Sequence, residues 1–145
     1  MRFSPIEILL VEDRPDTVQL MRAAFEHARS RFRLRVASSG EAARDCIHRC
    51  GPWAGGSCPD LILLNYGVSG GQGSELLREL KSCPETRNIP VIILTSAGEQ
   101  VVHQAYDQHA NCCVAMPDQL DELCRVVQAV DSFWFHTAEL PERPL

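Results

Sequence analysis

Residues that could do chemistry stand where apolar runs of this sequence end. The acidic pair Glu12 and Asp13 follows IEILLV, Asn65 follows DLILL, and Thr95 follows VIIL. Carboxylate oxygens are ligands for hard divalent cations, and a hydroxyl can donate a hydrogen bond to an anionic oxygen. Acids before a helix can also simply favour the positive end of its dipole. Their coincidence with Thr95 at another strand end nevertheless favours a metal-type pocket.

These residues need a scaffold that brings strand ends together, and the sequence alternates strand-like with helix-like segments. Strands are predicted at 6–11, 33–38, 60–65, 91–95 and 111–116. Helices are predicted from 15, after 39, at 74–82, at 99–110 and from 118 to about 135, with Ser39 and Asp118 as N-caps. Five β/α units in strict alternation predict an α/β domain, a doubly wound parallel sheet with helices on both faces. Its functional crevice should lie at the carboxyl ends of the strands.

Two segments carry further local signals. Arg33 and Arg35 alternate with apolar residues, which predicts a strand with one wet, charged side, suited to a sheet edge. Residues 66–73 contain four glycines, but they lack the spacing of a phosphate-binding loop. Their number instead predicts a flexible loop before the third helix.

Length and composition limit the class of protein. The 145 residues, 45% hydrophobic and 23% charged, suffice for one compact soluble domain that needs neither disulfides nor a metal to hold its core. A net charge of −5 without a basic tail argues against nucleic acid and membrane surfaces as partners. Neither an apolar signal region nor a membrane-spanning run is visible, so we expect a cytoplasmic protein.

Cysteine is unusually frequent, with seven residues: Cys46, Cys50, Cys58, Cys83, Cys112, Cys113 and Cys124. An odd number without a signal region favours free thiols in a reducing compartment. Cys46 and Cys50 are four residues apart, which is not a usual zinc spacing, so a role as small buried hydrophobic residues is favoured. Cys112 and Cys113 are adjacent on a strand, so their side chains should point to opposite faces and not pair.

Together these motifs resemble the receiver domain of bacterial two-component response regulators over nearly the whole chain. The matching segments are ILLVED (8–13), PDLILLN (59–65), Gly73, IPVIILTSA (89–97) and Pro117. The segments HANCCVAMP (109–117) and LDELCRVVQAVDSFWF (120–135) resemble more closely the single-domain regulators that partner phytochrome-type histidine kinases. The resemblance implies a flavodoxin-like, five-stranded sheet of order 2-1-3-4-5 with an extended last helix. It also implies a receiver domain over 1–135 and a tail over 136–145.

The resemblance also implies roles for the residues at the strand ends. In such receivers an acidic pair and an acceptor Asp hold Mg²⁺ with a backbone carbonyl, and a hydroxyl binds the transferred phosphoryl group. Carried over to this chain, the metal positions are Glu12, Asp13, Asn65 and the carbonyl of Gly67, and the hydroxyl position is Thr95.

Three positions depart from the family pattern. The acceptor position is Asn65, and because a neutral amide is a far poorer nucleophile than a carboxylate, no acyl phosphate should form there. The lost charge also predicts that any Mg²⁺ site is weak. Met116 replaces the Lys that pairs with the phosphoryl charge, and Cys113 replaces the aromatic of the switch. These departures predict a pseudo-receiver, a binding module and not an enzyme, that acts in two-component signalling by protein–protein contact.

Two alternatives stay open at this point. The chain could be an ordinary phosphorelay receiver whose natural acceptor Asp has been replaced by Asn65, although Met116 argues against it. It could also be a cysteine-based or ligand-binding sensor on the same fold.

The final helix predicts a surface for a partner. At 100° per residue its core stripe consists of Leu120, Leu123, Val127, Val130 and Trp134. Val126 and Phe133 lie about 80–100° from the middle of that stripe, and with Phe135 and the tail residues Leu140 and Pro141 they extend the apolar surface. The predicted dimer surface consists of Val126, Phe133, Trp134 and Phe135. A wide core face would explain this too. Because this segment forms a homodimer arm in phytochrome-partner regulators, the resemblance implies a homodimer and a sensor histidine kinase of the phytochrome type as partners.

Overall fold

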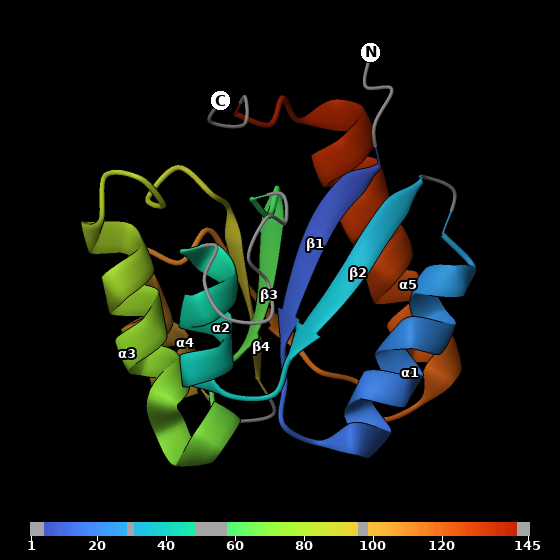
Figure 1. Ribbon diagram of the computed structural model, residues 1–145. Coiled ribbons are helices and arrows are strands. Elements are labelled where there is room, and N and C mark those ends of the chain that lie inside the picture. Colours follow the sequence, from blue (N-terminus) through green and yellow to red (C-terminus); the bar gives the residue numbers. More distant parts are fainter. Residues whose placement is uncertain (1–4, 29–30, 49–57, 96–98, 142–145) are drawn as a thin grey trace.

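A computed structural model describes residues 5–28, 31–48, 58–95 and 99–141 of the chain (Figure 1). The strands are β1 (Ile6–Val11), β2 (Phe32–Ala37), β3 (Leu61–Asn65), β4 (Val91–Thr95) and β5 (Cys112–Ala115). The helices are α1 (Pro15–Glu26), α2 (Gly40–Ile47), α3 (Val68–Ser82), α4 (Glu99–Asp107) and α5 (Leu120–Val130), and a π-helix, η2 (Asp131–Thr137), continues α5.

The five strands form one parallel sheet of order β2-β1-β3-β4-β5, as predicted. Figure 1 shows α1 and α5 on one face of this sheet and α2, α3 and α4 on the other. The chain passes from β1 to β2, which pairs with one side of β1, and then returns to β3, which pairs with the other side of β1. The carboxyl ends of β1 and β3, which are direct neighbours, therefore meet at the point where the winding reverses.

Successive residues of each strand enter different cores, because side chains alternate between the faces of a sheet. One core joins Leu9, Ile62 and Ile93 to α2, α3 and α4. The other joins Leu10, Leu63 and Ile92 to α1 and α5. Runs such as LILL in β3 are apolar throughout because both faces are covered.

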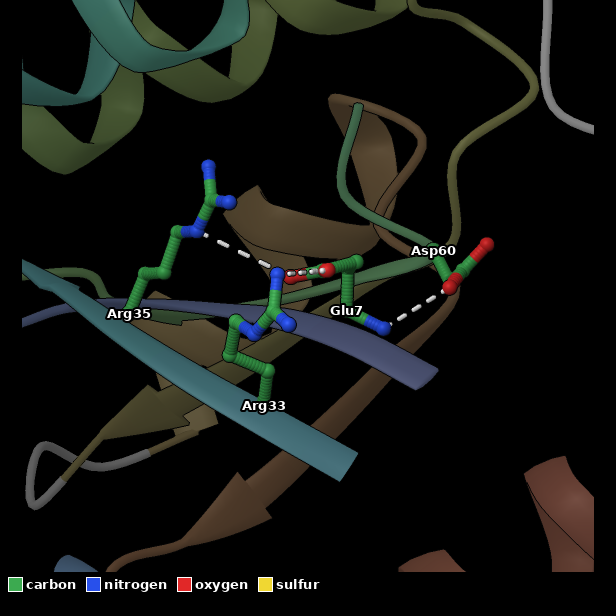
Figure 2. A network of polar contacts seen from close by, with 4 residues as sticks. All are labelled: Glu7, Arg33, Arg35 and Asp60. Carbon is green, nitrogen blue, oxygen red and sulfur yellow. Dashed lines mark hydrogen bonds and ion pairs between the residues drawn. The ribbon is translucent and has the colours of Figure 1, made fainter. Parts of the chain in front are cut away.

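The sheet edge at β2 is held by a polar network (Figure 2). Glu7 of β1 is 3% exposed. Its Oε1 lies 3.0 Å from Arg33 Nη1, its Oε2 lies 3.7 Å from Arg35 Nε, and its backbone N–H donates to Asp60 Oδ2 at 2.8 Å. The prediction of an edge strand is confirmed. On its charged side Arg33 is exposed and Arg35 is largely covered, and both lie against the buried carboxylate of Glu7, which they neutralise.

The prediction of a flexible glycine loop over 66–73 is wrong, because α3 already begins at Val68. Two of its glycines stand where the backbone geometry leaves no room for a side chain or favours glycine. Gly71 has a φ of +109°, which an L side chain rarely adopts, and at Gly73 an added Cβ would lie 2.4 Å from the carbonyl oxygen of Tyr66. Glycine therefore lets the start of α3 turn and pack closely, and its abundance does not make this segment a loop.

The two predicted helix caps have different outcomes. Ser39 caps α2 as predicted, accepting the backbone N–H of Ala42 on its Oγ at 3.0 Å. Asp118 does not cap α5: the N-cap is Gln119, which makes no side-chain cap hydrogen bond. The predicted closure of the second helix at Cys50–Pro52 lies outside the described residues.

The extended last helix is confirmed, but its final part is not an α-helix. In η2 the backbone N–H of Ala138 donates to the carbonyl of Phe133, an i to i+5 bond of 2.6 Å. The predicted core stripe nevertheless holds over most of its length: Leu123, Val127 and Val130 are buried, and Trp134 in η2 packs against the same core while partly buried. Phe133 is 53% exposed, and its ring stands edge-to-face to Trp134 with 5.1 Å between centroids. Leu120, the first residue of the predicted core stripe, is 40% exposed and is not part of the core.

Candidate functional site

The predicted site residues meet at the carboxyl ends of the strands. A pocket of about 280 Å³ opens there; its lining consists of Glu12, Arg14, Asp16, Thr17, Leu20, Asn65, Leu94, Thr95, Met116, Pro117 and Asp118. Glu12 and Asn65 sit side by side because β1 and β3 are paired, and Thr95 ends β4 on the other side of β3. Asp13 and Gly67 lie next to Glu12 and Asn65 along the chain, just outside this lining.

Both the nitrogen and the oxygen of the Asn65 side-chain amide form hydrogen bonds. Its Nδ2 donates to Glu12 Oε2 at 2.5 Å, and its Oδ1 accepts the backbone N–H of Gly67 at 3.0 Å. Glu12 Oε2 also accepts the backbone N–H of Asp13 at 3.0 Å. Glu12 is only 4% exposed, so these hydrogen bonds are what stabilises its carboxylate in a poorly solvated place. Asn65 thus acts as a hydrogen-bond donor to the acid beside it.

The second acid and the hydroxyl occupy opposite sides of this pair. Asp13 is exposed, and its Oδ2 accepts the backbone N–H of Ser69 at 3.1 Å, which ties the turn before α1 to the start of α3. Ser69 has a φ of +52°, a conformation that is uncommon for a residue other than glycine. Thr95 is buried at the end of β4. Thr95 also lines the pocket, on the strand that flanks β3 on the side away from β1.

The structure places Met116 and Cys113 as the sequence suggests. Met116 lines the pocket, and its thioether side chain packs against the core on the α1 and α5 side. Cys113 packs against the core on the α4 side, and Cys112 against the opposite core, which confirms that the two thiols face away from each other. A thiol at position 113 is too small to move as an aromatic lever would.

The single lysine lies at the other end of the sheet. Lys81 Nζ donates to the carbonyls of Arg87 and Ile89 and to Asn111 Oδ1, at 3.1, 2.9 and 2.9 Å. Ile89 and Asn111 precede β4 and β5, so these contacts are at the amino ends of the strands. Burial lowers the pKa of Lys81, but three oxygen acceptors hold the ammonium in place. This lysine therefore cannot serve the pocket.

The donor set does not fit a tightly held divalent cation. Two of the predicted metal ligands are carboxylates, but one oxygen of Glu12 is occupied by the amide of Asn65 and one oxygen of Asp13 by the backbone N–H of Ser69. Within the described part of the chain, no three histidine, cysteine or acidic side chains gather as metal ligands would. A cation here would have to displace the Asn65 amide from Glu12 and would gain only a neutral ligand in return.

Six thiols lie in the described ranges, and none of them forms a disulfide there. They are Cys46, Cys58, Cys83, Cys112, Cys113 and Cys124, and Cys50 lies outside those ranges. Burial raises the pKa of Cys46, Cys112 and Cys113, and Arg35 only partly offsets this for Cys46. A raised pKa means less thiolate at neutral pH, so these residues behave as small core residues.

Some residues of the pocket were missed by the sequence analysis. Arg14, Asp16 and Asp118 line it, and outside the lining the backbone N–H of Ser69 in α3 donates to Asp13. Asp16 in the first turn of α1 carried a signal, since it comes directly after the acidic pair and a proline. The bond from Ser69 carried none, because it joins residues 56 positions apart.

The geometry is that of a receiver, and comparison with known proteins agrees. Residues 8–128 match the family model of the response regulator receiver domain, so the chain belongs to this family and to two-component signalling. It is 33% identical to the response regulator Rcp1 of Synechocystis sp. over 138 residues, which cover 94% of each chain.

Solved structures agree on the fold over nearly the full length. The phosphorylated cyanobacterial phytochrome response regulator RcpA superposes with a TM-score of 0.88 at 31% identity, covering 96% of this chain and 100% of that one. The Mn²⁺-bound form of Rcp1 superposes with a TM-score of 0.86 at 32% identity, covering 95% and 100%. The chain is therefore related to phytochrome response regulators. In its described residues, no helix is long and apolar enough to cross a bilayer.

Proposed function

We propose that this protein is a pseudo-receiver, a response regulator that signals by protein–protein contact and does not accept phosphate at position 65. The observation that carries the proposal is the Asn65–Glu12 hydrogen bond of 2.5 Å, together with Met116 in the same pocket. An amide that donates to Glu12 cannot attack a phosphoryl donor, and a thioether cannot pair with phosphoryl charge. The scaffold, with its acids and Thr95, remains without the two groups on which phosphotransfer depends.

The test is incubation with acetyl phosphate in the presence of Mg²⁺, followed by intact-mass analysis. We expect the mass of the chain to stay unchanged, because no side chain at position 65 can form an acyl phosphate. A stoichiometric species heavier by one phosphoryl group would overturn the proposal. Peptide mapping of such a species would then identify the residue that accepts phosphate.

The proposed kinase partner rests on the relatives named above, and the proposed location rests on the cysteines. A sensor histidine kinase of the phytochrome type is the proposed partner, because relatives covering nearly the whole chain are named as phytochrome response regulators. Divalent metal is proposed to bind weakly, if loaded at high concentration, through Glu12 and Asp13 with Asn65 and the Gly67 carbonyl. Free thiols among the described cysteines support a cytoplasmic location.

A homodimer is proposed through α5, η2 and the tail from residue 136. The support is the exposed aromatic ring of Phe133, which stands edge-to-face to Trp134, with the partly buried Val126 and Phe135 on α5 and η2. A rigid, exposed aromatic residue supplies contact area at small entropic cost. Two-fold pairing of such a surface is the commonest form of self-association.

Phe133→Ser should shift the dimer to a monomer. Truncating a central aromatic residue of an interface costs about 2 kcal/mol or more, a thirtyfold or larger loss of affinity. Light scattering after gel filtration should give about twice 16.2 kDa for the natural chain and close to 16.2 kDa for the variant.

Leu120→Ser is the matched control. Leu120 is also an exposed apolar residue of α5, but it begins the helix, far from η2. This variant should keep the dimeric mass. If the natural chain is monomeric at high micromolar concentration, or if both variants dissociate equally, the proposed interface is wrong.

A further inference from the structure

The position of α4 depends little on apolar packing. Among the described side chains of α4, only Ala105 is fully buried, and Val101 packs against the same core while partly exposed. By contrast, α3 buries three leucines in that core, Leu76, Leu77 and Leu80. The free energy gained by packing a helix on a core scales with the apolar area that it removes from water. Because α4 buries little such area, other interactions must hold it in place.

Hydrogen bonds from neighbouring elements supply that placement at the carboxyl end of α4. Tyr66 Oη donates to Gln108 Oε1 at 2.6 Å, and Gln108 Nε2 donates to Ser74 Oγ at 2.8 Å. Tyr66 is a buried residue directly after β3, and Ser74 lies in α3. We call these three residues, Tyr66, Ser74 and Gln108, the Tyr66 clamp.

The clamp is attached firmly at both ends. The backbone N–H of Gln108 donates to the carbonyls of Gln104 and Ala105, both at 3.1 Å, so its side chain moves with α4. The backbone N–H of Tyr66 donates to the carbonyl of Leu94 at 3.2 Å, which fixes the other end to the sheet. A shift of α4 must therefore break a short hydrogen bond whose partners are partly or fully buried, where water replaces it poorly.

We propose that the Tyr66 clamp is a positioning device that holds α4 in one place without phosphate. It connects α4 to the residue next to Asn65 by a route that uses neither Thr95 nor position 113. The consequence is a preformed surface: α4 and its neighbour β5 are presented in a fixed arrangement, so a partner would not have to order them on binding.

The experiment is hydrogen–deuterium exchange of the unphosphorylated full chain, comparing natural protein with Tyr66→Phe. Losing one buried hydrogen bond should raise exchange of the α4 amides, residues 99–107, by about tenfold, while the amides of β1 and β3 keep their rates. The clamp matters for signalling only if the proposed pseudo-receiver function is right. Because the exchange experiment involves no phosphate, its failure is distinguishable from a failure of the phosphorylation test.

Tyr106→Phe is the matched control, since it removes the hydroxyl of the chain's other tyrosine. Tyr106 lies on α4, and its Oη accepts the backbone N–H of Cys113 at 3.2 Å. The residue is 48% exposed, so water can take over this bond and α4 exchange should change less than about twofold.

A double variant separates the clamp from a general loss of stability. If Tyr66 and Gln108 act through one contact, Tyr66→Phe combined with Gln108→Leu should exchange in α4 as fast as Gln108→Leu alone. Unchanged α4 exchange in Tyr66→Phe would overturn the proposal. Equal acceleration over the whole sheet would overturn it as well, because Tyr66 would then stabilise the fold and not the position of α4.

Discussion

The double variant Asn65→Asp/Met116→Lys is expected to take up phosphate from acetyl phosphate in the presence of Mg²⁺, and the natural chain is not. Both missing groups are restored on a scaffold that still carries Glu12, Asp13 and Thr95 at the strand ends. Intact-mass analysis over a time course measures the phosphorylated fraction directly.

The change at position 65 acts first through charge. It replaces an amide that donates to Glu12 with a second carboxylate at the same short range. Two unit charges about 4 Å apart repel by about 4 kcal/mol at an effective dielectric constant of about 20. A divalent cation relieves this repulsion, so Mg²⁺ should raise the Tm of Asn65→Asp by about 5 °C at saturating concentration. The natural chain should hardly respond, because its Glu12 already has a neutral donor.

The change at position 116 acts on the phosphoryl group. An ammonium at the pocket wall offers a charge-assisted hydrogen bond worth about 1.5–3 kcal/mol, or roughly ten- to hundredfold in the phosphorylated fraction. The aliphatic stem of Lys can replace the packing of Met116 on the core. Asn65→Asp alone should therefore label slowly.

Met116→Lys alone is the sharpest control, because it supplies the cation and leaves the amide at position 65. It should not label at all. Labelling of this single variant would mean that another side chain accepts phosphate, and the site would have to be sought elsewhere. Failure of the double variant to label would mean that the scaffold has lost more than these two groups.

The fold was predictable because its signals are local. Apolar runs such as LILL in β3 and VIIL in β4 mark strands covered on both faces, and their strict alternation with helical segments leaves few arrangements. Once the strands are parallel, their carboxyl ends must meet at one edge. Glu12, Asn65 and Thr95 could therefore be brought together without coordinates.

What could not be predicted depends on contacts between distant residues or on a change of helical period. The pairing of Asn65 with Glu12 and that of Tyr66 with Gln108 each join separate elements. The π-helix at Asp131–Thr137 was not predicted either, because no residue type in it signals the wider turn, although Trp134 still packs against the core and Phe133 is still exposed.

Gly73→Ala, near the glycine-rich start of α3, should lower the free energy of unfolding by about 2 kcal/mol. This loss is expected although Ala is a better helix former than Gly by about 1 kcal/mol. The added Cβ would lie 2.4 Å from the carbonyl oxygen of Tyr66 and 2.7 Å from its carbonyl carbon and Cα. These are backbone atoms at the end of a central strand, so they cannot turn aside as a side chain could. Urea unfolding followed by circular dichroism measures the change in the free energy of unfolding.

Gly67→Ala is the matched control, since it adds the same methyl group six residues earlier. Gly67 has a φ of −88°, and the nearest atom to its added Cβ is Asn65 Oδ1 at 3.7 Å, an ordinary contact. Its effect should stay within about 0.5 kcal/mol. If Gly73→Ala is as mild as this control, α3 does not lie against the backbone of Tyr66. Ser74 follows Gly73 on the same helix, and the close packing of α3 on Tyr66 brings Ser74 within hydrogen-bond distance of Gln108. Without that close packing, this contact would be lost too.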